Sequence, residues 1–98
     1  MCEKFFRRFA DSSLYDGGMP ASKEQLDRAL GREIHAAYVR EGMTAAEVAD
    51  KAGFSEATMT RILAGSGAPM SRIYMIASAI GVPVLEMVEA AVRRAEKE

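Results

Sequence analysis

Apolar residues recur at helical spacing between Ser22 and Gly42. They are Leu26, Leu30, Ile34, Ala37 and Tyr38. Spacings of three and four residues place such side chains along one face of an amphipathic helix. Serine is a good N-cap residue, and glycine commonly ends a helix. The pattern therefore predicts a long helix that begins at Lys23 and ends at Gly42.

Two shorter helices joined by a tight turn are predicted within residues 44–65. Thr44 and Glu47 form a capping-box pair at the start of the first helix, and Ser55 caps the second. Gly53 lies between them and is the residue type that ends a helix at positive φ without steric cost. The apolar residues expected to face inward are Val48, Ala49, Ala52, Met59, Ile62 and Leu63. The residues expected to face outward from the second helix are Glu56, Ala57, Thr60 and Arg61.

A fourth helix is predicted after a Ser-Gly-Ala-Pro loop, and it opens at Met70 or Ser71 and ends at Gly81. Its apolar face consists of Ile73, Ile76, Ala77 and Ile80. No stretch of the chain has a convincing strand pattern. Together with a last helix at residues 83–97, the pattern predicts an all-α bundle of five helices.

The helix predicted at residues 83–97 carries two neighbouring apolar stripes. Pro83 suits its first turn, because a proline there removes no helical hydrogen bond. The stripe expected to close the core consists of Leu85, Val88 and Val92. The stripe expected to remain at the surface consists of Val84, Met87 and Ala91. An exposed apolar set of this kind suits a two-fold dimer interface.

Residues 1–21 form an N-terminal aromatic extension ahead of the helical domain of residues 22–98. Phe5, Phe6 and Phe9 fall at positions i, i+1 and i+4, and a Gly-Gly pair and a proline follow them. Two interpretations stay open for this aromatic cluster. It either folds back onto the domain as a short sixth helix or forms a contact with a protein partner or a second copy, because a bare cluster would promote aggregation.

Composition narrows the classes of function. The chain has 98 residues, of which 49% are hydrophobic and 28% charged, as in an ordinary globular domain. Cys2 is the single cysteine and His35 the single histidine, which excludes an internal disulfide and a multi-cysteine metal site. We expect no cofactor, no metal and no enzymatic activity, because neither a catalytic cluster nor a nucleotide-binding glycine motif is present. Charges interrupt the apolar N-terminal stretch and no apolar run is long enough for a bilayer, so we expect a cytoplasmic protein.

A helix, a glycine turn and a second capped helix make residues 44–65 a helix-turn-helix layout. Residues on both sides extend the pattern: Leu30-Gly31-x-x-Ile34, Gly42-Met43-Thr44, Val48-Ala49-x-x-Ala52-Gly53-Phe54-Ser55, Thr58-Met59-x-Arg61-Ile62, Gly65 with Pro69, and Ile76-Ala77-x-Ala79-Ile80-Gly81-Val82. From about Leu30 to Leu85 the chain resembles the phage repressor/Cro-type (XRE-like) helix-turn-helix family. The resemblance implies a lambda-repressor-like domain of a bacterial or phage-infected cell, usually dimeric, that binds double-stranded DNA at an operator and regulates transcription.

The resemblance also implies roles for individual positions. The residues that match base-reading positions are Ser55, Glu56, Ala57, Thr60 and Arg61. The residues that match phosphate-contacting positions are Thr44, Ala45, Ser66, Gly67, Ser71 and Arg72. Among them, Arg61 has the side chain that bonds bidentately to guanine in the major groove, and Glu56 can accept a hydrogen bond from cytosine.

The charge balance and three replacements reduce the expected attraction to phosphate. The chain has 13 Lys and Arg against 14 Asp and Glu, a net charge of −1. Many relatives have Gln at the position of Ala45, and many have an Arg and a Glu where this chain has Tyr38 and Leu63. We expect the last two to form an apolar contact instead. Affinity for DNA then has to come from backbone and hydroxyl contacts, base readout and dimerisation.

Two functions follow from these observations. The leading one is a dimeric, sequence-specific transcriptional regulator of the Cro/repressor type that binds a pseudo-palindromic operator. The alternative is a protein-protein interaction module, antitoxin- or adaptor-like, that keeps the fold but binds DNA weakly. Such a module would contact its partner through Phe5, Phe6 and Phe9 or through the last helix. Arg7 and Arg8 could also reach DNA as an N-terminal arm.

Overall fold

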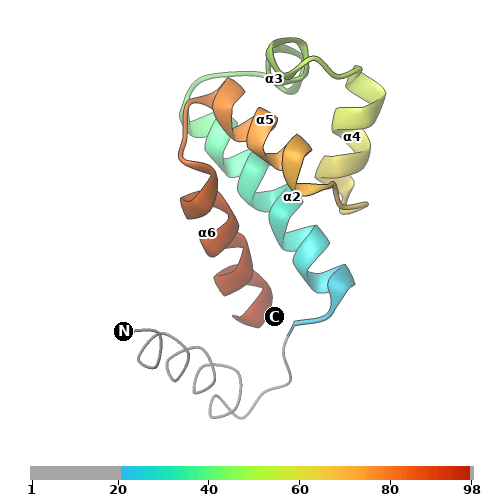
Figure 1. Ribbon diagram of the computed structural model, residues 1–98, viewed down its shortest axis with the longest axis vertical. Coiled ribbons are helices and arrows are strands. Elements are labelled where there is room, and N and C mark those ends of the chain that lie inside the picture. The colour runs from blue at the N-terminus through green and yellow to red at the C-terminus, as the bar shows by residue number, and fades with distance from the viewer. Residues whose placement is uncertain (1–20, 98) are drawn as a thin grey trace.

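The computed structural model describes residues 21–97, so the short helix considered for the N-terminal extension lies outside the described residues. Within residues 21–97 the chain forms five α-helices and no strand (Figure 1). They are α2 (Lys23–Arg40), α3 (Ala45–Ala52), α4 (Glu56–Ala64), α5 (Met70–Ile80) and α6 (Val84–Lys97). The prediction of an all-α, five-helix domain is confirmed.

Local side chains begin and end the helices where the sequence predicted. The Ser22 hydroxyl accepts from the backbone amide of Gln25, and the Gln25 side chain accepts from the backbone amide of Ser22, at 3.2 and 2.8 Å. Gly53 ends α3 with φ of 86°, a conformation that a residue with a Cβ rarely adopts. Each N-cap is worth about 1 kcal/mol, so these short helices start at defined residues. Two boundaries differ: α2 ends at Arg40 with Glu41 as its C-cap, before Gly42, and α6 begins at Val84, one residue after Pro83.

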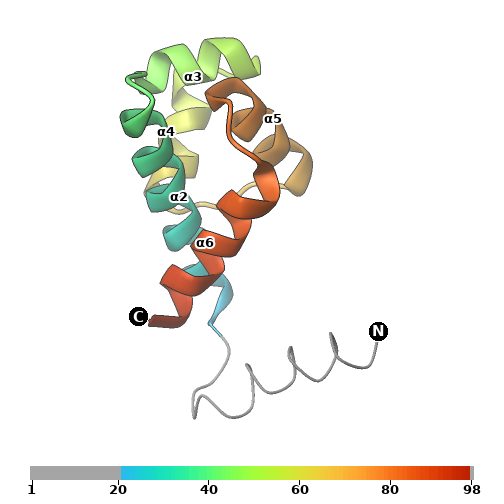
Figure 2. The same cartoon turned by 90° about the vertical axis from the view of Figure 1, so that its left-hand side faces the viewer.

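Helix α2 is the centre of the domain and contacts each of the other four helices. Figures 1 and 2 show α6 lying along α2 in the opposite direction, so that α6 ends beside the start of α2. The largest side chains with almost no exposure are Ile34, Met59, Ile76 and Val48. They come from four different helices, so one core joins α2, α3, α4 and α5, and Met87 and Ala91 join α6 to it.

The N-terminal part of α2 corrects one detail of the predicted stripe. Leu26 is partly exposed, whereas Ala29 has no exposed surface. The buried face of α2 continues through Gly31, where an added Cβ would lie 2.5 Å from the backbone oxygen of Leu63 in α4. The absence of a side chain at Gly31 lets the two helices approach closely at this crossing.

The two stripes of α6 are assigned the wrong way round in the sequence prediction. Met87 and Ala91, expected at the surface, are 5% and 1% exposed and belong to the core. Leu85, expected to close the core, is 74% exposed, and Val88 and Val92 are half-buried. Both stripes have helical spacing, and α6 packs with the Met87 stripe toward the core. Met87 and Ala91 are therefore not available as an exposed dimer interface.

Several apolar side chains remain at the surface of α5. Met70, Tyr74 and Met75 are all exposed.

No single helix in residues 21–97 is long and apolar enough to cross a membrane. Helices α5 and α6 reach that length and composition together, and they are bent by 111° at their junction. The opposite faces of both helices contribute to the core.

Candidate nucleic-acid interface

One face of α4 carries four of the five residues predicted to read bases. Glu56, Ala57, Thr60 and Arg61 are all exposed. Positions i, i+1, i+4 and i+5 of a helix share one side, so these side chains form a continuous surface. On the opposite side, Met59 and Ile62 are 1% and 2% exposed. The predicted division of α4 into an inner and an outer face is confirmed, and its contacts with bases stay a prediction.

Ser55, the fifth of these residues, caps α4. Its hydroxyl oxygen accepts from the backbone amide of Thr58 at 3.1 Å, and the hydroxyl donates to Thr58 Oγ1 at 3.0 Å. These two bonds hold the first turn of α4, where the exposed Glu56 also lies. The structure therefore accounts for Ser55 as a cap, as the capping pattern predicted.

Arg61 lies on the exposed side of the last two turns of α4. Its Nε donates a long hydrogen bond of 3.5 Å to the carbonyl oxygen of Ala57, one turn earlier. Arg61 forms no ion pair with another residue of the described range, 21–97. The two terminal nitrogens of its guanidinium can thus donate to an external acceptor without breaking an internal salt bridge.

The N-terminus of α3, predicted to meet a phosphate, already holds a carboxylate. Glu47 Oε1 accepts from the backbone amide of Thr44 at 2.9 Å, and Thr44 Oγ1 accepts from the amide of Glu47 at 3.2 Å. The negative side chain is favourable at this end of the helix dipole. A phosphate at the same place would be repelled by the negative charge of the Glu47 carboxylate. Ala45, the next residue, is half-buried.

The loop after α4 lies against the first turns of α2. A Cβ at Gly67 would come within 2.8 Å of the carboxylate of Asp27, so this acidic side chain touches the loop that was predicted to contact phosphate. Lys23 Nζ lies 2.7 Å from Asp27 Oδ2, and this hydrogen bond raises the pKa of Lys23 above its ordinary value. The pair brings both a negative and a positive charge to the Ser66–Gly67 loop.

The exposed residues Ser71 and Arg72 occupy the first turn of α5. The Arg72 guanidinium carbon lies 5.3 Å from the centre of the Phe54 ring, in cation–π geometry. Phe54 belongs to the turn between α3 and α4 and packs against the core. The contact therefore places the positive charge of Arg72 beside the turn, over the residue that precedes Ser55 in the chain.

Exposed charges of the two signs are balanced over residues 44–83, three acidic against three basic. The exposed acidic residues are Glu47, Asp50 and Glu56, and the exposed basic residues are Lys51, Arg61 and Arg72. The charges that Lys23 and Asp27 add beside the Ser66–Gly67 loop were not predicted. Their i, i+4 spacing was a signal for an ion pair on one helix. Their position beside Gly67 is a tertiary contact that no local pattern encodes.

Tyr38 and Leu63 both contribute to the apolar interior of the domain, and a direct contact between them stays a prediction. Tyr38 is buried in the core, and Leu63 is half-buried against it. Burial raises the pKa of the Tyr38 phenol, because the ionised form is poorly solvated there. The His35 ring meets Tyr38 edge-on, with 5.2 Å between the ring centres. His35 itself is exposed.

A known protein family matches the part of the chain that forms most of these helices. A family model described as "Helix-turn-helix domain" matches residues 29–93, about two thirds of the chain. The match begins within α2, includes α3, α4 and α5 completely, and ends within α6. No curated protein matches the chain.

Proposed function

The chain belongs to the helix-turn-helix domain family, and from this premise we propose that it is a sequence-specific DNA-binding transcriptional regulator of the Cro/repressor type. Membership of the family implies DNA binding and transcriptional regulation. The further proposal is that two copies bind a pseudo-palindromic operator. Their recognition helices would then lie about 34 Å apart, one turn of the DNA double helix.

The observation that supports base reading most strongly is the outer face of α4. Its exposed side chains are all small or polar, with no large apolar group, so this face can lie against base edges in a major groove. Arg61 has no internal ion-pair partner within residues 21–97 and would donate to O6 and N7 of a guanine. Arg72, held near the turn by Phe54, would contact a phosphate.

Dimerisation is proposed through the outer side of α6. Leu85 is the most exposed of the large hydrophobic residues on the described surface, and Val88 and Val92 follow it at helical spacing. A second copy related by a two-fold axis would cover the same stripe. Leu85→Asp is expected to shift the protein to monomer in sedimentation experiments and to weaken operator binding at the same protein concentration.

Selection of bound sites from a random DNA pool at stated salt concentration tests the proposed function. We expect inverted repeats to be enriched. Arg61→Ala is then expected to weaken binding to the selected site by roughly 5- to 150-fold, because a bidentate arginine–guanine pair contributes about 1–3 kcal/mol of discrimination. Arg93→Ala is the matched control, since Arg93 is an exposed arginine on α6 paired with Glu89 at 2.9 Å.

The two arginine variants remove the same charge, so a general loss of attraction to DNA would affect both. A loss confined to Arg61→Ala would identify a specific contact. Absence of any enriched sequence with the folded protein would contradict sequence-specific regulation. The salt dependence of binding should be shallow, because few phosphates are neutralised by a surface with balanced charges.

The alternative, a protein-protein interaction module with weak DNA binding, has its own supporting observation. Carboxylates stand at two of the places where the resemblance expected phosphates, Glu47 at the start of α3 and Asp27 beside Gly67. Both would repel a DNA backbone. If no DNA sequence is enriched and the biological activity of Arg61→Ala equals that of the unchanged protein, the interaction module becomes the better description.

A further inference from the structure

A groove runs between α2 and α6, on a side of the molecule that does not include the exposed face of α4. It consists of two adjoining hollows of about 340 and 450 Å³, which share Glu33 and Ala90 in their walls. In the larger one, nearer the C-terminal end of α6, the remaining walls are Arg93, Arg94 and Lys97. Arg94 also pairs with Glu33 at 2.8 Å and thereby links the two helices across the groove.

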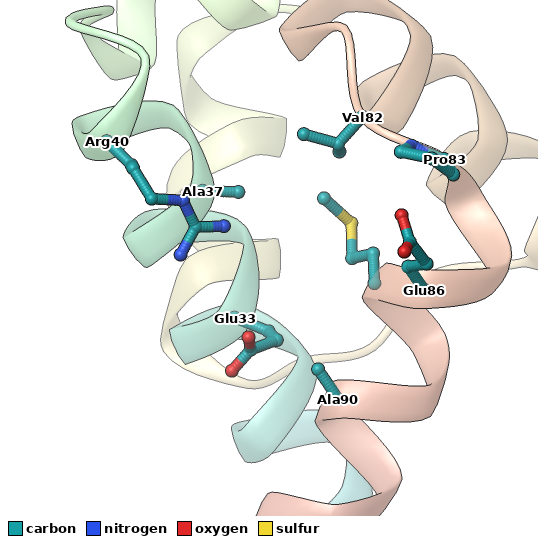
Figure 3. A pocket seen from close by; sticks show the side chains of 8 residues that line it. Glu33, Ala37, Arg40, Val82, Pro83, Glu86 and Ala90 are labelled. Atoms are coloured by element: carbon teal, nitrogen blue, oxygen red, sulfur yellow. The ribbon is translucent and has the colours of Figure 1, made fainter.

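The smaller hollow has an apolar floor and an acidic rim. Ala37, Val82 and Met87 contribute apolar surface between the helices. Figure 3 shows Glu33 projecting from α2 and Glu86 from the start of α6, on the two sides of this hollow, with Arg40 at its upper end. The charged residues that line the smaller hollow are Glu33, Glu86 and Arg40, and those that line the larger hollow are Arg93, Arg94, Lys97 and Glu33. One basic against two acidic residues give the smaller hollow a formal charge of −1, and three basic against one acidic give the larger hollow +2.

The chain enters this arrangement at the basic end of the groove. Ala21 and Ser22 precede α2, and the end of α6 lies next to them in both views (Figures 1 and 2). The smaller hollow lies beside Glu33 and Ala37, about 11 to 15 residues further along α2, or roughly 20 Å at 1.5 Å per helical residue. The twelve residues from 10 to 21 can span up to about 40 Å when extended. The aromatic cluster that precedes them is thus within reach of the apolar floor.

The order of charges in the N-terminal extension is complementary to the groove. Moving back from Ala21, the chain first presents two acidic residues, Asp16 and Asp11. It then presents three phenylalanines interleaved with three basic residues, namely Phe9, Arg8, Arg7, Phe6, Phe5 and Lys4. A segment that follows the groove from its basic end would bring its acidic residues to Arg93 and Lys97 first. Its aromatic and basic residues would then reach the apolar floor and the carboxylates.

We propose that residues 4–16 of the same chain lie in the groove between α2 and α6. Phe5, Phe6 and Phe9 pack on the apolar floor. Arg7 and Arg8 lie beside Glu86, which has no ion-pair partner within residues 21–97, and beside Glu33, which also holds Arg94. The segment covers apolar surface that the five helices leave open, and it stabilises the α2–α6 contact. This inference does not depend on DNA binding, because the groove and the outer face of α4 share no residue.

The exposed side of α5 is a less suitable place for the same segment. Tyr74, Met75 and Met70 offer apolar surface there, but the lining of the adjoining hollow contains Lys51 and no carboxylate that could pair with Arg7 and Arg8. The hollow beside Tyr74 and Met75 also has a volume of only about 270 Å³. Charge therefore distinguishes the two surfaces more clearly than apolar area does.

Cys2 provides a direct test, because it is the only cysteine of the chain. A nitroxide spin label on Cys2 of the full chain is expected to reduce the NMR amide signals of Ala37, Glu86 and Ala90. The signals of Tyr74 and Met75 should keep their intensity. Replacing all three phenylalanines of the cluster by serine should restore the groove signals, while the helical content stays unchanged.

Variants with exchanged charges test whether Arg7 and Arg8 pair with carboxylates of the groove. Glu86→Lys alone and Arg7→Glu with Arg8→Glu are each expected to weaken the effect of the label on the groove, and the combination of all three is expected to recover part of it. Glu86 is exposed and forms no ion pair within residues 21–97, so its replacement should leave the helices folded. Raising the salt concentration should reduce the effect in the unchanged protein.

Three results would overturn the proposal. One is signal loss on α5 instead of the groove, and another is no signal loss within residues 21–97. The third comes from a mixture of isotope-labelled chains without the nitroxide and spin-labelled chains without the isotope. Signal loss in that mixture would show that the segment occupies the groove of a second copy.

Discussion

The helices α4 and α6 both pack on α2, but the two contacts are built differently. At Gly31, α2 approaches the last turn of α4 so closely that a Cβ would lie 2.5 and 2.9 Å from the backbone oxygens of Leu63 and Ile62. Against α6 the contact is made by side chains, including Met87 and the Glu33–Arg94 pair. It leaves hollows of about 340 and 450 Å³ along its length.

The two contacts of α2 therefore differ in how rigidly they hold the neighbouring helix. Backbones in contact cannot adjust, so α4 and its outer face are held at one position relative to α2. Flexible side chains such as methionine can adapt, so the α2–α6 contact can receive a further segment. The proposed recognition surface thus depends on close packing, and the proposed groove depends on incomplete packing.

The largest expected change in stability comes from a substitution at the α2–α6 contact. Met87→Ala should lower the free energy of unfolding by about 2–5 kcal/mol, because it removes a buried side chain and leaves a cavity. Leu85→Ala should change it by less than about 0.5 kcal/mol, since Leu85 is exposed. Urea unfolding at a protein concentration too low for dimerisation measures both. Equal losses would mean that the assignment of the two α6 stripes is wrong.

A smaller effect is expected where α2 meets α4. Gly31→Ala should cost about 1–3 kcal/mol by overpacking, although alanine favours a helix over glycine by about 1 kcal/mol. The added methyl should also displace α4, so Gly31→Ala should weaken DNA binding more than Met87→Ala does at a temperature where both are folded. If Gly31→Ala stabilises the protein, the backbone contact is not as close as described.

The smallest effect concerns Tyr38, a mostly buried residue of α2. Below about pH 10 both the folded and the unfolded chain hold the Tyr38 proton. Above that pH the unfolded chain loses it first, because burial raises the pKa of Tyr38 in the folded state. The free energy of unfolding should therefore fall with rising pH in this range. Tyr38→Phe should show a smaller fall in urea titrations at pH 9 to 11, and identical slopes would indicate that the phenol is well solvated.

The sequence predicted the helices better than it predicted their contacts. The caps at Ser22, Thr44 and Ser55 depend on neighbours three residues away, so local pattern was sufficient for them. The two faces of α4 were also predictable, because polar residues on one side left only one apolar set. On α6 two apolar stripes lie side by side, and local periodicity cannot choose between them.

The candidate interface divides in the same way. The resemblance placed Glu56 to Arg61 on the second helix of a helix-turn-helix, and the structure exposes these side chains on one face. The carboxylate of Asp27 beside Gly67 and the stacking of Arg72 on Phe54 were not predicted. Both contacts join residues that are distant in the chain, and their formation depends on the packing of α2, α4 and α5.

The helices, their order and the family can be recognised from the amino-acid sequence, because capping, glycine turns and helical periodicity act over a few residues. Tertiary packing sets which stripe of α6 is buried, where α2 and α4 touch, and the groove that remains between α2 and α6. These features follow from the distances and angles between helices. Such distances depend on all the side chains of the core together, so no single segment of the chain encodes them.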